Sequence, residues 1–307
     1  MSAMTLDETT FNAAVERHRR ELHVHCYRML GSFEEAEDAL QDALVRAWRA
    51  RDGFSGEGLR AWLYTIATNV CLDALRRSRR RAAAAEVPWL EPYPDRLLDE
   101  IAPSDEEPDA VVVARETIEL TYMALIQLLP PRQRAVLILR DVLEWSAAET
   151  AAMLDVSVAA ANSALQRARA TLRDELPARP ATRVALSEDE ERLLAGFIAN
   201  HESGDYEAAA ELMREDIRVT MPPSPDVYEG RAALAPLFAT ARAMGDWRLV
   251  PIRANRQPGA ASYLRRPGER EWRAFKFDIL RCEDGKIAEI TTFGARHFGA
   301  FGLPEAL

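Results

Sequence analysis

The most informative stretch of this chain is residues 33–81, FEEAEDALQDALVRAWRARDGFSGEGLRAWLYTIATNVCLDALRRSRRR. Its first part predicts an amphipathic helix, because apolar residues recur at helical spacing at Leu40, Leu44, Ala47 and Trp48. A second stripe of the same helix is polar and acidic and contains Asp38, Gln41, Asp42 and Val45. Such a stripe is either a solvated surface or a contact face for a basic partner.

The second part predicts a helix that ends in a cluster of arginines. Its apolar residues are Trp62, Leu63, Ile66 and Val70, with Asn69 and Asp73 on a neighbouring face. Arginines at a helix C-terminus complement the helix dipole, but the cluster exceeds that need, with Arg76, Arg77, Arg79, Arg80 and Arg81. This density of charge suits phosphate contacts. Aromatic residues beside a polar loop suit unstacked bases.

Charge is unevenly distributed along the 307 residues, although the formal net charge is −10. Residues 11–81 contain 13 arginines against 10 acidic residues, whereas residues 82–116 contain 2 against 10. The predicted DNA-contacting segment therefore stays locally basic, at +3, beside a linker at −8. The three cysteines lack metal-ligand spacing, and we expect neither a metal nor a cofactor. Without an apolar signal core or a membrane-length apolar run, we expect a cytoplasmic protein with no membrane partner.

Residues 33–81 resemble regions 2.2 to 2.4 of bacterial RNA polymerase sigma factors of the extracytoplasmic-function (ECF) type. The resemblance implies a domain at residues 8–81 whose acidic face, Asp38 to Val45, contacts the polymerase clamp. It also implies that the second helix opens the −10 element and captures a flipped base. The residues expected to contact DNA are Trp62, Asn69, Asp73, Arg76, Arg77 and Arg80. The loop at roughly residues 51–60 is expected to help form the base pocket.

Residues 82–115 predict an acidic linker in which prolines forbid a continuous helix, at Pro88, Pro92, Pro94, Pro103 and Pro108. We expect residues 103–109 to be a flexible tether. The stretch PWLEPYPDRLL (88–98) is different, because large apolar side chains are costly to leave in water. We expect it to dock on the C-terminal domain or on polymerase through Trp89, Leu90, Tyr93, Leu97 and Leu98.

Residues 116–176 predict helices only. A helix from Leu120 leads to the break at Pro130-Pro131, and a second helix follows over residues 134–143. Next come SAAETAAMLDVS (146–157) and VAAANSALQRARATLR (158–173), which predict a helix, a tight turn and a second helix. Ser157 is a suitable N-cap. The expected buried stripe of the last helix is Val158, Ala161, Leu165, Ala168 and Leu172.

This segment resembles sigma region 4, which reads the −35 element with a helix-turn-helix. The resemblance implies that Asn162, Ser163 and Gln166 contact bases, and that Arg167 or Arg169 holds phosphate. The chain departs from the common family pattern at Asn162, where a lysine or arginine is frequent. Alanines at 160 and 164 also replace commonly polar residues. The −35 preference is therefore open.

Residues 187–307 predict an α+β domain. Ser187 and Glu190 form a capping box before a helix that ends near Gly204, and a short helix follows at residues 206–213. We expect a strand at 217–223, a helix at 231–244 and four strands at 247–257, 260–265, 272–282 and 286–293. The last two strands are joined by the turn Glu283-Asp284-Gly285, a strong hairpin signal.

The element order and the segment MPPSPDVYEGRAAL (221–234) resemble the SnoaL-like branch of the NTF2-like fold, a cone with an internal pocket. Some members of that branch are cyclases or isomerases that use an acidic residue and a histidine, for which Asp278 and His297 are the candidates here. The expected pocket walls are Tyr228, Trp247, Phe275 and Phe293. Single acids and histidines at strand ends are common, so we favour ligand binding or intramolecular contact over catalysis.

Together these features predict a multidomain protein, with two all-α domains followed by an NTF2-like α+β cone. The expected function is that of a sigma factor, which binds core RNA polymerase and promoter DNA. Its C-terminal domain is expected to modulate activity and to accept a small molecule. Two alternatives stay open. A free-standing helix-turn-helix regulator leaves the acidic stripe without a role, and a tethered cyclase or isomerase requires turnover by residues 187–307.

Overall fold

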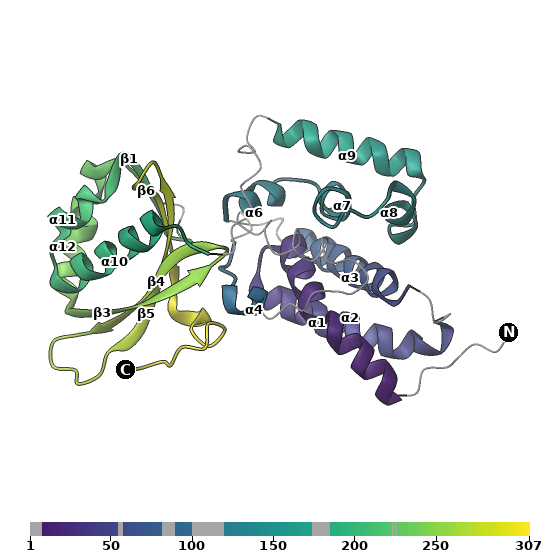
Figure 1. Ribbon diagram of the computed structural model, residues 1–307, viewed down its shortest axis with the longest axis horizontal. Coiled ribbons are helices and arrows are strands. Elements are labelled where there is room, and N and C mark those ends of the chain that lie inside the picture. The colour runs from purple at the N-terminus through teal and green to yellow at the C-terminus, as the bar shows by residue number, and fades with distance from the viewer. Residues whose placement is uncertain are drawn as a thin grey trace. The chain divides into compact units, whose positions relative to one another are not determined.

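The structure is a computed structural model that describes residues 8–54, 58–81, 90–99, 120–173, 185–222, 224 and 226–307. The chain divides into two compact units (Figure 1): residues 1–91 with 97–182, and residues 92–96 with 183–307. The first unit is helical and the second is α+β, as expected from the sequence. Among the helices of the described residues, none is both long enough and apolar enough to cross a membrane.

Three helices begin the first unit: α1 (Glu8–Leu30), α2 (Phe33–Ala50) and α3 (Leu59–Arg81). α2 begins at residue 33 because the Ser32 hydroxyl accepts a hydrogen bond from the Glu35 amide at 3.1 Å. Its buried face consists of Ala36, Ala39, Leu40, Ala43 and Ala47. The predicted apolar stripe is therefore right at Leu40 and Ala47 and wrong at Leu44 and Trp48, which are only partly buried. Small residues occupy the interface because α2 packs against both α1 and α3.

The helices after the linker are α6 (Leu120–Gln127), α7 (Pro131–Leu137), the π-helical turn η2 (Ile138–Val142), α8 (Ala147–Met153) and α9 (Val158–Leu172). The helix predicted over residues 134–143 begins earlier, because Pro131 is well suited to the first helical position. α8 and α9 form the predicted helix-turn-helix. Its turn contains Asp155, whose φ is +50°, and the predicted N-cap of α9 is confirmed, since the Ser157 hydroxyl accepts from the Ala160 amide at 3.1 Å.

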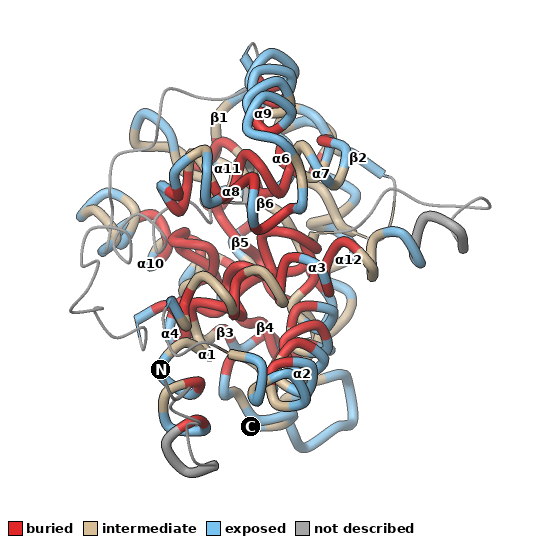
Figure 2. Tube along the Cα trace, turned by 90° about the vertical axis from the view of Figure 1, so that its right-hand side faces the viewer, coloured by how far each residue is buried: buried red, intermediate tan, exposed pale blue. Residues whose placement is uncertain are grey.

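α9 buries one face and exposes the other (Figure 2). Ala161, Leu165, Ala168 and Leu172 are buried as predicted, where α9 packs on α7. Val158 is not buried: it is 44% exposed. Val158 is the first residue of α9, and the buried face begins at Ala161. The prediction that Val158 is buried was therefore wrong.

The end of α1 is joined to α6 and α7 through Arg134. This buried guanidinium donates to the carbonyl oxygens of Met29, of Gln127 at 2.7 Å and of Leu129 at 3.2 Å. Gln127 in turn donates to the Arg28 carbonyl at 3.1 Å. Burial lowers the pKa of Arg134 to about 10, so the guanidinium keeps its charge at neutral pH. The orphan carbonyls of the last turn of α1 thus find partners about a hundred residues away.

The second unit begins with α10 (Glu188–Ser203) and α11 (Tyr206–Glu211). The strands are β1 (Met213–Thr220), β2 (Val227–Glu229), β3 (Asp246–Ala254), β4 (Gln257–Arg265), β5 (Arg273–Glu283) and β6 (Lys286–Gly294). They form one sheet in the order β2-β1-β6-β5-β4-β3, in which β1 and β6 are parallel and the other neighbours antiparallel. η3 (Arg231–Leu234) and α12 (Ala235–Met244) connect β2 to β3, and η4 (Ala295–His297) follows β6.

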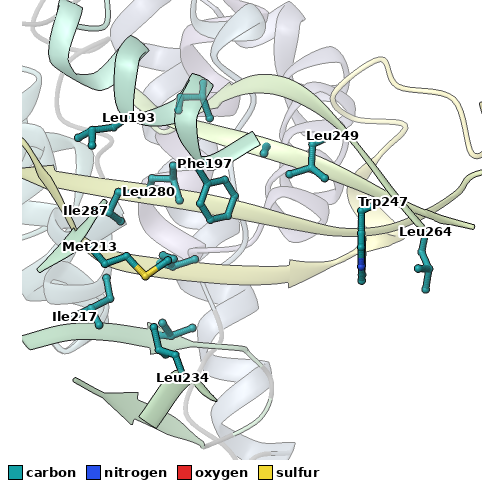
Figure 3. Packing of buried hydrophobic residues seen from close by; sticks show 14 residues of the cluster. Leu193, Phe197, Met213, Ile217, Leu234, Trp247, Leu249, Leu264, Leu280 and Ile287 are labelled. Carbon is teal, nitrogen blue, oxygen red and sulfur yellow. The ribbon is translucent and has the colours of Figure 1, made fainter. Parts of the chain in front are cut away.

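The core of this unit lies between α10 and the sheet (Figure 3). Leu193 and Phe197 of α10 pack among side chains of the strands, including Met213, Ile217 and Leu280. The predicted capping box starts α10: the Ser187 hydroxyl accepts from the Glu190 amide at 3.3 Å, and the Glu190 carboxylate accepts from the Ser187 amide at 2.8 Å. The predicted hairpin between β5 and β6 is also present, with positive φ at Asp284 and Gly285.

The strand bounds differ from the predictions at two places. β1 begins at Met213, four residues before the predicted start, because the Met213–Thr220 stretch pairs with β6. The turn between β3 and β4 is Asn255-Arg256, with φ of +54° and +60°, and β4 therefore starts at Gln257. β2 was not predicted, since three residues beside prolines carry too little alternation to identify a strand.

Residues 92–96 of the linker belong to the second unit, which is only part of the stretch 88–98 that was expected to dock on the C-terminal domain or on polymerase; residues 90, 91, 97 and 98 belong to the first unit. Pro94 bridges to Ala254, and the Tyr93 amide donates to the Asn255 side chain at 2.7 Å. The buried Asp95 carboxylate accepts from the Arg256 amide at 2.8 Å and lies 3.3 Å from the Arg253 guanidinium. Tyr93, Leu97 and Leu98 are buried. Trp89, together with Pro103, Pro108 and the tether at 103–109, lies outside the described residues.

We expect Arg134→Leu to lower the free energy of unfolding by about 1–3 kcal/mol, because it leaves several buried carbonyl oxygens without a donor. The matched control is Arg132→Leu, an exposed arginine of the same helix. Urea unfolding followed by circular dichroism measures both. Equal stability of the two variants would show that Arg134 does not hold α1 to the later helices.

Candidate polymerase, DNA and ligand sites

The acidic stripe of α2 lies at the surface. Asp38, Gln41, Asp42 and Val45 are all exposed, and Val45 is 48% exposed, which is unusual for a large apolar side chain. Asp38 and Asp42 line a groove of about 230 Å³ together with Arg77 of α3. The four residues of the stripe are exposed, so their polar groups and the one apolar side chain are accessible to a partner.

The basic end of α3 lies beside this groove. Arg76 and Arg77 are exposed, whereas the side chain of Arg80 lies outside the described part of the helix. Asp73 is paired with Arg46 at 3.2 Å and with Arg76 at 2.5 Å, so it reduces the positive charge at the start of the cluster. Asn69 is exposed and donates to the Thr65 carbonyl at 2.9 Å.

Trp62 forms an aromatic group with residues from α1 and from the segment before α3. Its ring centroid lies 5.0 Å from that of Phe54 and 6.3 Å from that of Phe11. Trp48, expected in the helix core, packs beside them at 5.9 Å from Phe11. The guanidinium of Arg51 covers Trp48 at 3.8 Å from its ring centroid. The group is partly exposed and could stack on an unpaired base.

Arg60 does not belong to the loop that the sequence predicted for the base pocket. It lies inside α3, is buried, and pairs with Glu21 of α1 at 3.0 Å. Burial alone would raise the pKa of Glu21, but the hydrogen bond with His18 and the charge of Arg60 outweigh it, so the pKa is lowered. Of the predicted loop, residues 51–54 and 58 are described and 55–57 are not.

The exposed face of α9 carries the predicted base and phosphate contacts. Asn162, Ser163, Gln166, Arg167 and Arg169 are all exposed. Two of them are engaged within the chain: Arg167 donates to the Ser163 hydroxyl at 2.6 Å, and Arg169 forms a two-bond contact with Asp141 at 2.9 and 2.6 Å. Asn162 and Gln166 make no side-chain hydrogen bond to any described residue. These two side chains would therefore not need to break a hydrogen bond to a described side chain before contacting another molecule.

The second unit contains a cavity of about 380 Å³. Three of the four expected wall residues line it, Trp247, Phe275 and Phe293, together with the candidate acid Asp278. Tyr228 packs against the apolar core without lining the cavity. His297 is also absent from the lining. It lies on η4, buried, and accepts a hydrogen bond from its neighbour Arg296 at 2.9 Å. The expected pairing of Asp278 with His297 therefore does not occur in this cavity.

A different histidine occupies the polar end of the cavity. His201, on the last turn of α10, lines it beside Lys276 and Asp278. The sequence analysis missed His201 because it lies in a helix, where its spacing from Phe197 indicates only a core position. Lys276 was missed as well, although it precedes Asp278 by two residues and therefore shares its face of the strand.

The Asp278 carboxylate is fully supplied with donors. Lys276 approaches both of its oxygens, at 3.0 and 2.8 Å, Thr292 donates at 2.7 Å and Ser262 at 3.4 Å. Burial by itself would raise the pKa of Asp278. The charge of Lys276 and the hydrogen bonds outweigh that effect, so its pKa is lowered. Burial lowers the pKa of His201 to about 3, with the Lys276 charge acting in the same direction. The cavity thus ends in an ion pair and a neutral imidazole.

The fold and these surfaces are those of a protein that contacts both DNA and another protein. A helical module with an acidic face beside a basic helix end, joined to a helix-turn-helix, connects a protein partner to DNA. Family models agree with this assignment: Sigma-70 region 2 matches residues 14–81, Sigma-70 region 4 matches residues 120–172, and a SnoaL-like domain matches residues 194–290.

Whole-chain similarity identifies the family within that class. The chain is 40% identical over 321 residues to the ECF RNA polymerase sigma factor SigG of Mycobacterium tuberculosis, covering 97% of this chain and 85% of that protein. It is 31% identical to SigW of Bacillus subtilis over 175 residues, covering 55% of this chain and 90% of that protein. The crystal structure of the M. tuberculosis ECF sigma factor SigJ shares the fold, with a TM-score of 0.65 and 22% identity over 97% of this chain and all of that one. The chain belongs to the ECF sigma factors, which bind core RNA polymerase and direct promoter-specific transcription initiation.

We expect Asp38→Arg with Asp42→Arg to weaken binding to core polymerase by at least about ten-fold, since charge reversal on a contact face opposes a basic partner. Both side chains are exposed, so the helical content should not change. The matched control reverses two exposed acids of α10, Glu188 and Glu191. Co-purification with core polymerase tests both variants, and unchanged binding by the α2 variant would show that the acidic face is only solvated surface.

We expect Asn162→Ala and Gln166→Ala each to lose about 1–3 kcal/mol of discrimination at one position of the −35 element. Arg76→Ala with Arg77→Ala should weaken binding across all sequences and flatten its salt dependence, because phosphate contacts carry no sequence information. Binding of the protein with core polymerase to a promoter library measures both effects. The opposite result, with altered preference only in the arginine variant, would reverse the assignment of the two surfaces.

Proposed function

We propose that α2 binds the polymerase clamp through Asp38, Gln41, Asp42 and Val45, and that the Trp62 group and the end of α3 engage the −10 element. In the same proposal Asn162 and Gln166 of α9 contact −35 bases. The exposure of these polar side chains in two separate helical modules is the observation that carries it. The activity takes place where core polymerase is, in the cytoplasm.

Arg167 and Arg169 have a second role in this proposal. Each holds a neighbour in the absence of DNA, Ser163 and Asp141 respectively. Phosphate binding by Arg169 requires the Asp141 contact to open or to be shared. Since exposed ion pairs contribute little stability, about 1 kcal/mol or less, a phosphate can replace the carboxylate at small cost.

Promoter binding also requires the helical modules to separate. The element names place −35 and −10 about 25 base pairs apart, or ~85 Å along B-DNA. The longest helices described in the first unit, α1 and α3, have 23 residues each and are therefore only ~35 Å long. Two modules held together by Arg134 at the end of α1 cannot reach both elements of a straight duplex. We infer that the Arg134 contacts belong to the free protein and that polymerase binding opens them.

The C-terminal domain in this proposal regulates initiation through the linker and catalyses nothing. Residues 92–96 pack within the second unit although they lie between helices of the first. The domain can therefore alter the course of the linker between the two DNA-binding modules. Proton transfer is disfavoured in the cavity, because Asp278 is ionised and saturated with donors and His201 stays neutral at physiological pH.

We expect Asp95→Ala to change promoter-specific transcription several-fold at equal protein concentration. The change removes the buried carboxylate that accepts from the Arg256 amide and lies 3.3 Å from the Arg253 guanidinium, and a buried hydrogen bond to a charged group contributes about 1.5–3 kcal/mol. The control is Asp99→Ala, an exposed acid of the same short helix, α4 (Asp95–Asp99). Run-off transcription with core polymerase measures both variants.

The same assay distinguishes the remaining outcomes. Wild-type transcription by Asp95→Ala would show that the linker contact does not regulate initiation. Absence of promoter-specific transcription by the unmodified chain with core polymerase would contradict the sigma assignment of these surfaces. Turnover of a small ketone by the full-length protein would contradict the non-catalytic role of the cavity.

A further inference from the structure

The cavity of the second unit has the size and wall chemistry of a small-molecule site. Its volume of about 380 Å³ falls within the range of roughly 300–1,000 Å³ that is usual for such sites. The walls are almost entirely apolar and aromatic and come from the sheet, α10 and α12, including Phe197, Met213, Phe238, Met244, Trp247 and Phe275. Methionine side chains adapt to irregular ligand shapes. Most of an occupant must therefore be apolar.

The polar groups gather at one end. Lys276 Nζ gives hydrogen bonds to Asp278 and lies 5.8 Å from the Trp247 ring centroid. An ammonium has three donors, and Lys276 lines the cavity, so one donor is left for an occupant. The Asp278 oxygens already accept from three side chains and offer little to a further donor.

His201 adds a second unsatisfied group at this end. Its ring is enclosed by Phe197, Tyr206 and Trp247, with centroid distances of 5.6, 5.3 and 5.4 Å. The side chain is 7% exposed, and its Nε2 has no hydrogen-bond partner among the described residues. Buried polar nitrogens are nearly always paired in folded proteins. An imidazole in an aromatic enclosure, with one nitrogen unpaired beside a cavity, indicates a partner supplied by an occupant.

The charges at this end select an uncharged occupant. Lys276 and Asp278 neutralise each other, so the site has no net charge to offer. A carboxylate head would meet Lys276 but would also approach the Asp278 carboxylate, and like charges at short range are unfavourable. A cationic head would approach Lys276 while finding Asp278 already saturated. A carbonyl oxygen, by contrast, brings no charge. It can accept one hydrogen bond from Lys276 and one from Nε2–H of the neutral His201 ring.

We propose that this cavity binds a neutral, predominantly apolar molecule with one carbonyl-type acceptor oxygen, which Lys276 and His201 hold at the polar end. This inference rests on the proposed regulatory function of the second unit and specifies the chemistry of the signal. A ligand that orders the cavity walls stabilises the unit that holds linker residues 92–96, so its binding can shift the population of the docked linker.

The test uses the full-length protein and propionyl-dimethylaminonaphthalene, a neutral naphthyl ketone whose fluorescence shifts to the blue in apolar surroundings. Two companion probes complete the set: dimethylaminonaphthalene, which lacks the carbonyl, and dimethylaminonaphthoate, which replaces the ketone by a carboxylate. We expect the ketone to bind at least about ten-fold more tightly than either companion, since one buried hydrogen bond to a charged donor accounts for that ratio.

Two variants test whether the ketone is held at the polar end. His201→Phe keeps an aromatic ring in the enclosure and removes the nitrogens. Lys276→Met with Asp278→Leu removes the ion pair together, which avoids leaving one buried charge unpaired. Each should weaken ketone binding by about ten-fold and leave binding of the carbonyl-free probe, dimethylaminonaphthalene, within about two-fold. The control is Lys286→Met, which changes the other lysine of the chain, located at the start of β6 away from the cavity lining.

The inference would be overturned if the unmodified protein bound the ketone and the carbonyl-free probe equally well, if it bound the carboxylate more tightly than the ketone, or if the polar-end variants left ketone binding unchanged. Failure of all three probes to bind would overturn it as well. Thermal unfolding of each variant shows whether a lost affinity reflects a lost fold. Run-off transcription by the unmodified protein in the absence of any probe tests the proposed function on its own. The ligand inference can therefore be contradicted while promoter-specific transcription is still observed.

Discussion

The last turn of α1 obtains its hydrogen-bond partners from residues far away in the sequence, and the first unit depends on that arrangement. The Tyr27 hydroxyl donates to the Glu91 carbonyl at 2.6 Å, and the Glu91 amide donates to the Gly31 carbonyl at 2.9 Å. Arg134 and Gln127 supply donors to the adjacent carbonyls. A side chain at Gly31 would meet Gln127 at 3.0 Å, and its φ of +77° favours glycine. One helix end thus joins the N-terminal helices, the linker and the later helices.

Charge is divided between surfaces that serve different partners. The acidic stripe of α2 and the arginines at the end of α3 lie close enough to line one groove, which is compatible with simultaneous contact to a basic protein and to DNA. The polar side chains on the exposed face of α9 differ in whether they already have a partner within the chain. α9 presents Asn162 and Gln166 without internal partners, while Arg167 and Arg169 of the same face are engaged. If the proposed roles hold, the base-contacting groups of α9 are free of internal hydrogen bonds to described side chains, whereas the proposed phosphate contacts must exchange partners.

The second unit combines an interaction surface and a cavity in one fold. Its β3–β4 turn, Asn255-Arg256, holds linker residues 93–95 through backbone and carboxylate contacts. Its cavity is lined by Trp247 near the start of β3, by Phe275, Lys276 and Asp278 of β5, and by residues of α10 and α12. Strand β3 runs from Trp247 at the cavity to Ala254 at the linker contact. One strand therefore extends from the proposed ligand site to the linker contact, which offers a physical route for the proposed regulation.

The sequence by itself determined the class of each element, because periodicity, caps and turns are local: the Ser157 and Ser187 caps, the Asp284-Gly285 hairpin and the exposed stripe of α2 are all present. The family resemblance identified the function of the chain. Tertiary structure decided which side chains meet. Alanines, and not Leu44 or Trp48, fill the buried face of α2 where it packs against α1 and α3. The Arg60 side chain is buried and pairs with Glu21. His201, and not His297, lines the cavity beside Asp278. Such outcomes depend on distances between residues far apart in the chain, which no local pattern contains.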